Sequence, residues 1–137
     1  LEKVYLDSNS GDSFLRTATA IAAGNFHTCA IRDNSSIKCW GLNDSGQLGI
    51  VYDSLDDGND GGPNNLLYLD RGSDVDLGAG RTARGIAAGD SHTCAMLDNA
   101  SIKCWGGNAF GQLGLGDTNN RGDNSSEMGD NLPVIGL

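Results

Sequence analysis

The 137-residue sequence has few aromatic and few basic residues. Aromatic residues make up 6% of the chain, and 9 lysines and arginines stand against 18 aspartates and glutamates, which gives a formal net charge of −9. An acidic surface of this kind has no general attraction for phosphate backbones or anionic lipids. We therefore expect neither a nucleic acid nor a membrane as partner, and the short apolar runs predict no membrane-spanning segment.

Proline is also scarce, with 2 residues, whereas glycine is abundant, with 21. This combination excludes a collagen, a proline-rich linker and a bundle dominated by helices. The length suffices for one domain but not for two well-formed cores. The chain begins at Leu1 without a recognisable signal peptide, as a processed protein or an excised fragment would.

What the sequence does contain is an internal repeat. Residues 16–49 and 81–114 are identical at 24 of 34 aligned positions, without a gap and at an offset of 65 residues. Self-similarity over such a length is typical of a repeat architecture. We assign the first repeat to residues 1–80 and the second to residues 81–137.

The segments outside the repeated core complete this division. The first repeat carries a long acidic loop at residues 53–65, and a second polar loop covers residues 117–131. Both are too polar for a core and too long for simple turns, so we expect insertions at one rim of the fold. Residues 132–137 are similar to segments that precede each repeat, which predicts the first strand of a following unit.

Each repeat has the pattern of short β-strands joined by turns. Residues 27–31 and 37–41 form a predicted hairpin centred on Asn34. Alternation with a period of two places Cys29 and Cys39 on one face, directly opposite each other. No apolar stripe with a 3.6-residue period persists, so the fold class that we predict is all-β.

The four cysteines occupy equivalent positions in the two repeats. Opposed Cβ atoms of a hairpin lie about 4.5–5.5 Å apart, which approaches the geometry of a disulfide. We therefore predict the disulfides Cys29–Cys39 and Cys94–Cys104, which favour an oxidising, extracellular compartment. Free buried cysteines are one alternative, and zinc bound by two cysteines and His27 is another, although the close ligand spacing of zinc sites is missing.

Three motifs occur in the same order in both repeats. They are Gly-x-x-His-Thr-x-Ala, then Trp-Gly after a hairpin, then Asn-x-x-Gly-Gln-Leu-Gly. This order resembles the repeat of the regulator of chromosome condensation family. The motifs occupy Gly24–Ala30, Trp40-Gly41 and Asn43–Gly49, and again Gly89–Ala95, Trp105-Gly106 and Asn108–Gly114.

The resemblance implies β-propeller blades of four antiparallel strands, commonly seven in a ring, which serve mostly as interaction platforms. This chain departs from the family in having only two blades and in carrying cysteines where apolar residues are usual. Because a blade buries its faces only against neighbouring blades, we expect an incomplete propeller, completed by neighbouring copies or by a longer chain. The terminal strand expected at 132–137 favours head-to-tail contacts between copies, which close into a ring or continue as a filament.

The histidines and tryptophans recur with the repeat. His27 and His92 are therefore expected to be hydrogen-bonded core residues, and Trp40 and Trp105 to be buried between blades. A catalytic residue is normally unique, and no nucleophile, phosphate-loop or zinc-protease motif occurs in the sequence. We predict that the protein is not an enzyme.

Two acidic loops contain oxygen ligands of the kind that calcium binds, but neither follows the EF-hand pattern. A solvated loop is the simpler interpretation, and no other cofactor is expected. The calcium candidates are Asp53, Asp56, Asp57, Asp60, Asp117 and Asp123.

Four Asn-x-Ser sequons are candidate glycosylation sites if the source secretes through an endoplasmic reticulum. Two of them lie at matching hairpin tips, where a glycan would fit. Arg121-Gly122-Asp123 is an integrin-type tripeptide, too short to be specific. The sequons begin at Asn34, Asn43, Asn99 and Asn124.

Taken together, these features favour a non-catalytic extracellular structural or interaction protein that self-associates head to tail, with a filament as one form. The alternative is a fragment of a longer binding propeller that recognises a protein or glycan through its rim loops. The nucleotide exchange activity of the founding family member is disfavoured by the acidity, the predicted disulfides and the short chain.

Overall fold

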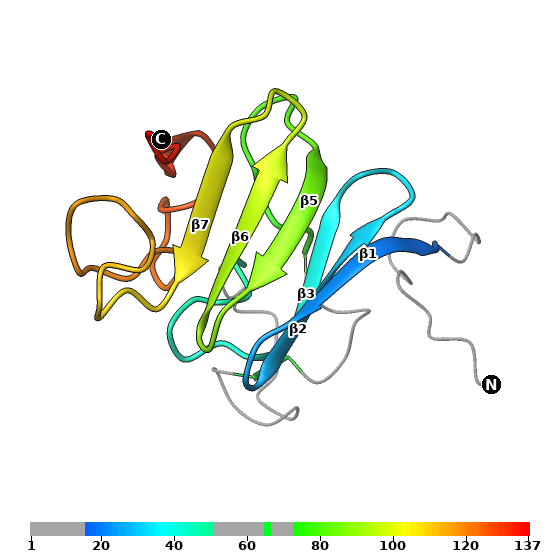
Figure 1. The fold of residues 1–137 in the computed structure, drawn as a ribbon. Helices are drawn as coiled ribbons and strands as arrows, with labels where there is room; N and C mark the ends of the chain where they lie inside the picture. Colours follow the sequence, from blue (N-terminus) through cyan, green and yellow to red (C-terminus); the bar gives the residue numbers. More distant parts are fainter. Residues whose placement is uncertain (1–15, 51–64, 67–72) are drawn as a thin grey trace.

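The computed structural model describes residues 16–50, 65–66 and 73–137. Within these residues it contains two antiparallel sheets that stand side by side as consecutive blades (Figure 1). The first blade has the strand order β1-β2-β3-β4, and the second has the order β5-β6-β7. The strands are β1 (Ala18–Ala23), β2 (His27–Arg32), β3 (Ile37–Leu42), β4 (Asn65–Leu66), β5 (Ala83–Ala88), β6 (His92–Leu97) and β7 (Ile102–Gly106).

Helical structure is limited to one short element in this part of the chain. It is the 3-10 helix η1, which covers Gly129–Asn131. No helix among the described residues has the length and apolar character needed to cross a membrane. The all-β fold class predicted from the sequence is confirmed.

The hairpin register predicted by alternation is confirmed as well. In the first blade Cys29 pairs with Cys39 and Ile31 with Ile37, and the second blade repeats these pairs. Ser35 occupies the left-handed region at the hairpin tip, with a φ of 65°. The Ser36 N–H donates to Oδ1 of Asn34 at 3.2 Å, which closes the tip.

The alanine-rich strands β1 and β5 explain how the two blades approach each other. Strand β5 contacts both β1 and β2 of the first blade. Small side chains allow this close packing, and Ala83 at the start of β5 is buried. Its N–H donates to the carbonyl of Ser35 at the first hairpin tip, at 2.9 Å. The core therefore lies between the blades rather than within one of them.

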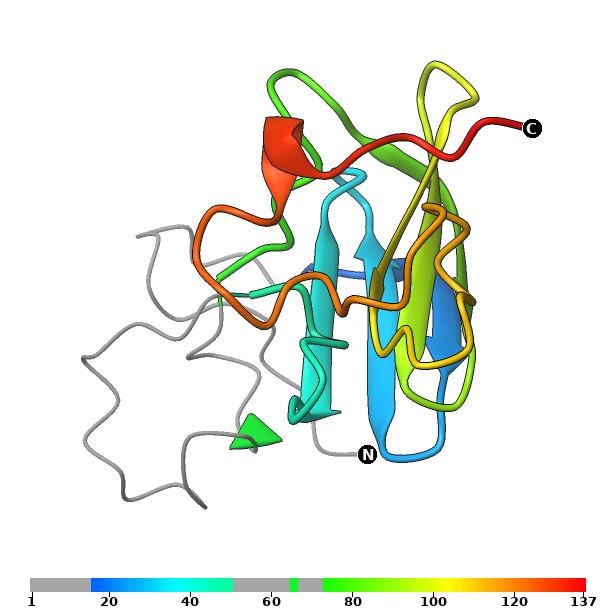
Figure 2. The same ribbon diagram turned by 90° about the vertical axis from the view of Figure 1, so that its left-hand side faces the viewer.

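Residues 132–137 do not form the strand that we expected. They contain no strand, and the N–H of Ile135 donates to the carbonyl of Ile102 in β7 at 2.9 Å. Val75 makes the same bond to Ile37 in the first blade, at 3.0 Å. The segment therefore forms no strand, and it is hydrogen-bonded beside the start of β7 in the place that residues 73–77 take beside β3 (Figure 2).

The second of the two polar loops differs from a simple solvated insertion. The acidic loop at 53–65 lies outside the described residues except for Asn65, which begins β4. The loop at 117–131 pairs with the end of β7 through a bridge between Arg121 and Gly106, and it buries Met128 in the core. Hydrogen bonds from Lys103 and Asn108 to carbonyl groups of the loop add to these contacts, so the polar loop is fixed against the second blade.

Both predicted disulfides form in the structure. Cys29–Cys39 and Cys94–Cys104 each join the two strands of one hairpin across 10 positions of sequence. Among the described residues no cysteine is free. Each disulfide therefore stabilises one blade internally and does not connect the two blades.

Removing either disulfide by paired alanine substitution is expected to lower the free energy of unfolding by roughly 2–3 kcal/mol, because both close loops of the same length. The loss should be larger for Cys29→Ala/Cys39→Ala, since these side chains are fully buried whereas Cys94 is half-buried. Urea unfolding of the two variants measures the difference. Four reactive thiols in denaturant without reductant would contradict the pairing itself.

Candidate interaction site: the interface between the blades

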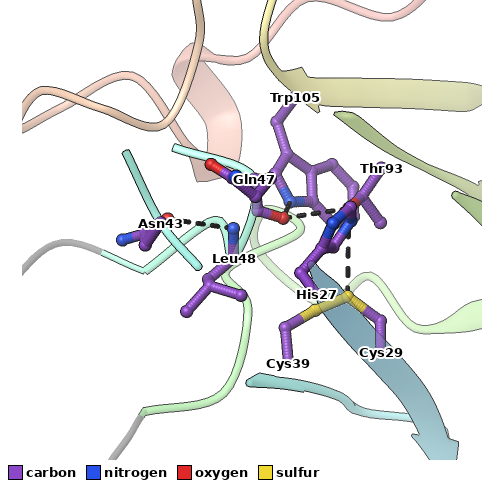
Figure 3. The surroundings of a disulfide bond; sticks show 8 residues. All are labelled: His27, Cys29, Cys39, Asn43, Gln47, Leu48, Thr93 and Trp105. Atoms are coloured by element: carbon purple, nitrogen blue, oxygen red, sulfur yellow. Dashed lines mark hydrogen bonds between the residues drawn. A yellow bond between two sulfur atoms is a disulfide. The ribbon is translucent and has the colours of Figure 1, made fainter. Parts of the chain in front are cut away.

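The face of the first blade that carries Cys29 packs against the face of the second blade that carries Trp105. We call this contact the inter-blade interface. It consists of the side chains of His27, Cys29, Ile31, Thr93 and Trp105 and the loop at residues 43–49 (Figure 3).

The carbonyl of Gln47 is the centre of this interface. It accepts a hydrogen bond from the Thr93 hydroxyl at 2.9 Å and another from Nε1 of Trp105 at 3.1 Å. Gln47, Thr93 and Trp105 are all fully buried. Because an unpaired buried donor or acceptor is costly, these bonds hold the loop of the first repeat against two strands of the second.

His27 extends the same network across to β2. Its Nε2 lies 2.9 Å from Oγ1 of Thr93. The single hydroxyl hydrogen of Thr93 is already donated to Gln47, so Nε2 of His27 must carry the hydrogen and donate it to Thr93. This assignment leaves Nδ1 of His27 as a bare, buried acceptor without a partner.

The electrostatics agree with that tautomer. Burial lowers the pKa of His27 below its ordinary value of 6.5, and the neighbouring His92 lowers this pKa further. A second proton on Nδ1 would create a buried N–H without an acceptor. His27 is therefore neutral at neutral pH and acts as a structural donor.

The glycine of the Gly-x-x-His motif has a direct packing role. A Cβ atom built at Gly24 would overlap the His27 ring, and one at Gly89 would overlap the His92 ring. The ring thus lies over a bare Cα atom in both repeats. Sequence reasoning identified the histidines but missed the roles of Gly24 and Gln47, although the repeated motifs contained both residues.

The first disulfide is part of the interface as well. Sγ of Cys29 lies 3.9 Å from Oγ1 of Thr93. Trp105 is buried between the blades as predicted, whereas its counterpart Trp40 is only half-buried. The difference arises because the second blade has a neighbour on its Trp105 face and the first blade has no described neighbour on its Trp40 face.

The sequons fall into two structural groups. Asn34 and Asn99 are exposed at the hairpin tips, and their Oδ1 atoms accept hydrogen bonds from the hydroxyls of Ser36 and Ser101. The other two asparagines bond within their loops. Oδ1 of Asn43 accepts from the N–H of Leu48, and Nδ2 of Asn124 donates to Asp123 and Glu127. Glycosylation stays a prediction, and the hairpin tips are the positions that best accommodate it.

The acidic loop of the second repeat is organised by an ion pair. Asp117 lies 2.8 Å from Arg121, whose hydrogen bond lowers the pKa of the Asp117 carboxyl. This contact holds the arginine of the Arg121-Gly122-Asp123 tripeptide against its own loop. It also occupies one of the calcium candidates.

The remaining calcium candidates are not gathered into a site where the structure describes them. Desolvation raises the pKa of Asp123, which lies beside Glu127. In the described ranges no group of three or more His, Cys, Asp or Glu side chains is placed to hold a metal ion. Asp53, Asp56, Asp57 and Asp60 lie outside those ranges, so calcium binding stays an untested prediction.

Thr93→Val is expected to lower the free energy of unfolding by about 1–3 kcal/mol, because it leaves the buried donor of His27 unpaired and removes one bond to Gln47. The matched control is Thr28→Val, which changes the half-buried counterpart in the first repeat. Urea unfolding should show a clearly smaller loss for the control. An equal decrease in the free energy of unfolding for both variants would mean that the hydrogen bonds of Thr93 do not stabilise the interface.

Lowering the pH is expected to weaken the fold through His27. Its pKa in the folded state is below 6.5, so the unfolded state binds more protons once the pH falls below about 6.5. The free energy of unfolding should then decrease as the pH drops from 7 toward 5. Urea unfolding measures the free energy of unfolding at each pH, and its dependence on pH should be weaker for His27→Gln than for the wild type. An unchanged dependence would contradict the neutral, buried state assigned to His27.

Comparison with known proteins places this geometry in context. Residues 18–47 and 83–112 match the family described as Regulator of chromosome condensation (RCC1) repeat. The probable E3 ubiquitin-protein ligase HERC4 of Homo sapiens is 35% identical over 101 residues, which cover 74% of this chain and 8% of that protein. The ultraviolet-B receptor UVR8 of Arabidopsis thaliana is 31% identical over 103 residues, which cover 74% of this chain and 20% of that protein.

Solved structures agree on the fold. Prp20p from Saccharomyces cerevisiae superposes with a TM-score of 0.68 at 20% identity, covering 93% of this chain and 27% of that one. Yeast RCC1 (Prp20) bound to Kap60 gives 0.67 at 20% identity, covering 89% of this chain and 25% of that one. The chain spans only 8 to 20% of the length of the curated relatives HERC4 and UVR8. With two copies of the repeat packed as consecutive blades, the chain belongs to the regulator of chromosome condensation repeat family and forms an incomplete β-propeller.

Proposed function

We propose that the chain is a two-blade segment of a non-catalytic, extracellular β-propeller-type interaction protein whose open faces are covered by further blades. The observation that carries this proposal is the unequal burial of equivalent residues. Ile31 is 3% exposed, whereas its counterpart Met96 is 45% exposed. Val75 and Ile135 make equivalent hydrogen bonds to the two blades, so Leu77 and Leu137, two residues further on, are also counterparts; Leu77 is buried, whereas Leu137 is fully exposed. In each pair only the residue that faces the other blade is covered.

The two open faces are the two halves of one interface. The C-terminal face, defined by His92, Cys94 and Met96, repeats the half that the first blade contributes. The N-terminal face, defined by the exposed Ile21 and the half-buried Thr28 and Trp40, repeats the half that the second blade contributes, although Ala30 and Lys38 beside them are buried. Complementary halves at opposite ends give heterologous, head-to-tail contacts, which close into a ring or continue as a filament.

An oxidising compartment is the second part of the proposal. Two hairpin disulfides support it, because cytosolic thiols are normally kept reduced. The exposed sequons Asn34 and Asn99 would project glycans from the hairpin tips into solvent. The absence of a catalytic role is supported by the use of His27 as a structural donor in a repeated motif.

A second candidate function rests on the length of the relatives. Since the chain spans a fifth or less of HERC4 and UVR8, it also fits a segment of a longer binding propeller. Prp20p, which shares the fold, has binding properties toward Gsp1p and histones. By analogy, the rim loops of a propeller that contains this chain would recognise a protein or a glycan.

Both candidates require that the open faces couple to a further blade. In a tandem fusion that joins Leu137 of one copy to Leu1 of a second, one open face of each copy becomes covered. Because repeat stability is the sum of unit and neighbour terms, the tandem should unfold at a higher urea concentration than the single chain.

The matched control is a tandem in which the second copy carries Trp40→Asp, which charges the covered face. It should unfold near the midpoint of the single chain. A tandem that unfolds at the same urea concentration as one copy would show that the faces do not couple, and the proposal would fail.

A further inference from the structure

One corner of the inter-blade interface is built from three very small residues. A Cβ atom placed on Gly107 would lie 3.4 Å from Cβ of Ser91 and 3.6 Å from Cβ of Ser45. Ser45 comes from the first blade, whereas Ser91 and Gly107 come from the second. The N–H of Gly107 donates to the carbonyl of Ser91 at 2.8 Å, which fixes their relative position.

All three positions change to large apolar residues in the other repeat. The residues 65 positions away from Ser91 and Gly107 are Phe26 and Leu42. The N–H of Leu42 donates to the carbonyl of Phe26 at 2.9 Å, so this pair has the geometry of its counterpart. The counterpart of Ser45 is Phe110. Phe26 is 68% exposed and Phe110 is 93% exposed, so neither side chain is buried by packing within the chain.

The repeat geometry places these residues at opposite ends of the chain. Phe26 and Leu42 lie at the corner of the N-terminal face, and Phe110 lies at the corner of the C-terminal face. Within one chain the first-blade serine meets the second-blade corner. When the same contact is made between two copies, Phe110 of one copy meets Phe26 and Leu42 of the next.

Other exposed apolar residues follow the same pattern. Ile21 on the N-terminal face is exposed, whereas its counterpart Ile86 packs against the core. Met96 and Leu137 are exposed, although their first-repeat counterparts are buried. Val134 is the exception, because its counterpart is the solvent-exposed Asp74. Of the six large hydrophobic residues exposed in the described ranges, five therefore belong to the two open faces.

The hydrogen-bonding groups of the interface are retained as well. The groups that form the network between the blades are His27, Gln47, Thr93 and Trp105. Their counterparts on the open faces are identical residues, namely His92, Gln112, Thr28 and Trp40. A second copy would thus restore every bond of the network and add three apolar side chains at the corner.

We propose that the C-terminal face binds the N-terminal face of a second copy of this chain, with Phe110 packed against Phe26 and Leu42 of that copy. This inference rests on the proposed function and names the partner for the open faces. The polar network alone does not identify the partner, because both repeats of this chain carry the same residues. The corner does identify it, because the large apolar residue on the C-terminal face, Phe110, meets large apolar residues, Phe26 and Leu42, on the N-terminal face of a second copy.

The first test measures self-association of the complete chain by sedimentation velocity over a range of concentrations. Phe110→Ser and Phe26→Ser restore the residues of the internal corner and should each weaken association at least tenfold. Val134→Ser is the matched control, because it removes an exposed apolar side chain outside both faces, and it should leave association unchanged. Circular dichroism of each variant checks that the blades remain folded.

The second test establishes which faces meet. One variant carries Met96→Asp and Phe110→Asp on the C-terminal face, and the other carries Ile21→Asp and Phe26→Asp on the N-terminal face. Each variant alone should be monomeric, and an equimolar mixture should form a dimer of two chains, because each retains one intact half. A dimer formed by either variant alone would overturn the head-to-tail arrangement.

A wild-type chain that stays monomeric at all concentrations would overturn this inference. If the tandem fusion were nevertheless stabilised, the open faces would be covered by blades of a longer chain and the proposed function would stand. If neither effect were seen, both would fail. Association that persists unchanged in Phe110→Ser and Phe26→Ser would also overturn the assignment of the corner.

Discussion

The buried carbonyl of Gln47 is the contact on which the arrangement of the two blades depends. It accepts hydrogen bonds from two fully buried donors of the second blade, Thr93 and Trp105, and His27 joins the network through Thr93. Buried polar groups are stable only when they are paired, so moving one blade relative to the other would leave several groups unpaired. The network therefore fixes the orientation of the blades, whereas apolar side chains such as Ile31 form the buried core.

Stability in this chain is divided between two levels. The disulfides Cys29–Cys39 and Cys94–Cys104 act within single hairpins, where they compensate for the thin core of a small β unit. The network and the apolar contacts act between hairpins. Because a blade has two faces and the inter-blade interface covers only one face of each blade, the other face of each blade has no described blade packed against it.

The difference between the two repeats is as informative as their similarity. Identical residues such as Trp40 and Trp105 have different burial because only one of them faces a described neighbour. Where the repeats differ in sequence at the interface corner, the change is from serine or glycine to a large apolar residue, as between Ser91 and Phe26 or between Gly107 and Leu42. The sequence of each blade thus differs with its position in the pair.

The sequence pattern of each hairpin was enough to determine its register. Alternation of side chains and the turn at Asn34 predict the pairing of Cys29 with Cys39 from residues within the hairpin. The repeated motifs also determined the blade-like fold and the burial of Trp105. Only the tertiary structure decided that Ile135 is hydrogen-bonded to Ile102 of β7 and that the Gln47 carbonyl accepts hydrogen bonds from Thr93 and Trp105. The physical reason is that strand register depends on residues close in sequence, whereas contacts between blades join groups many positions apart.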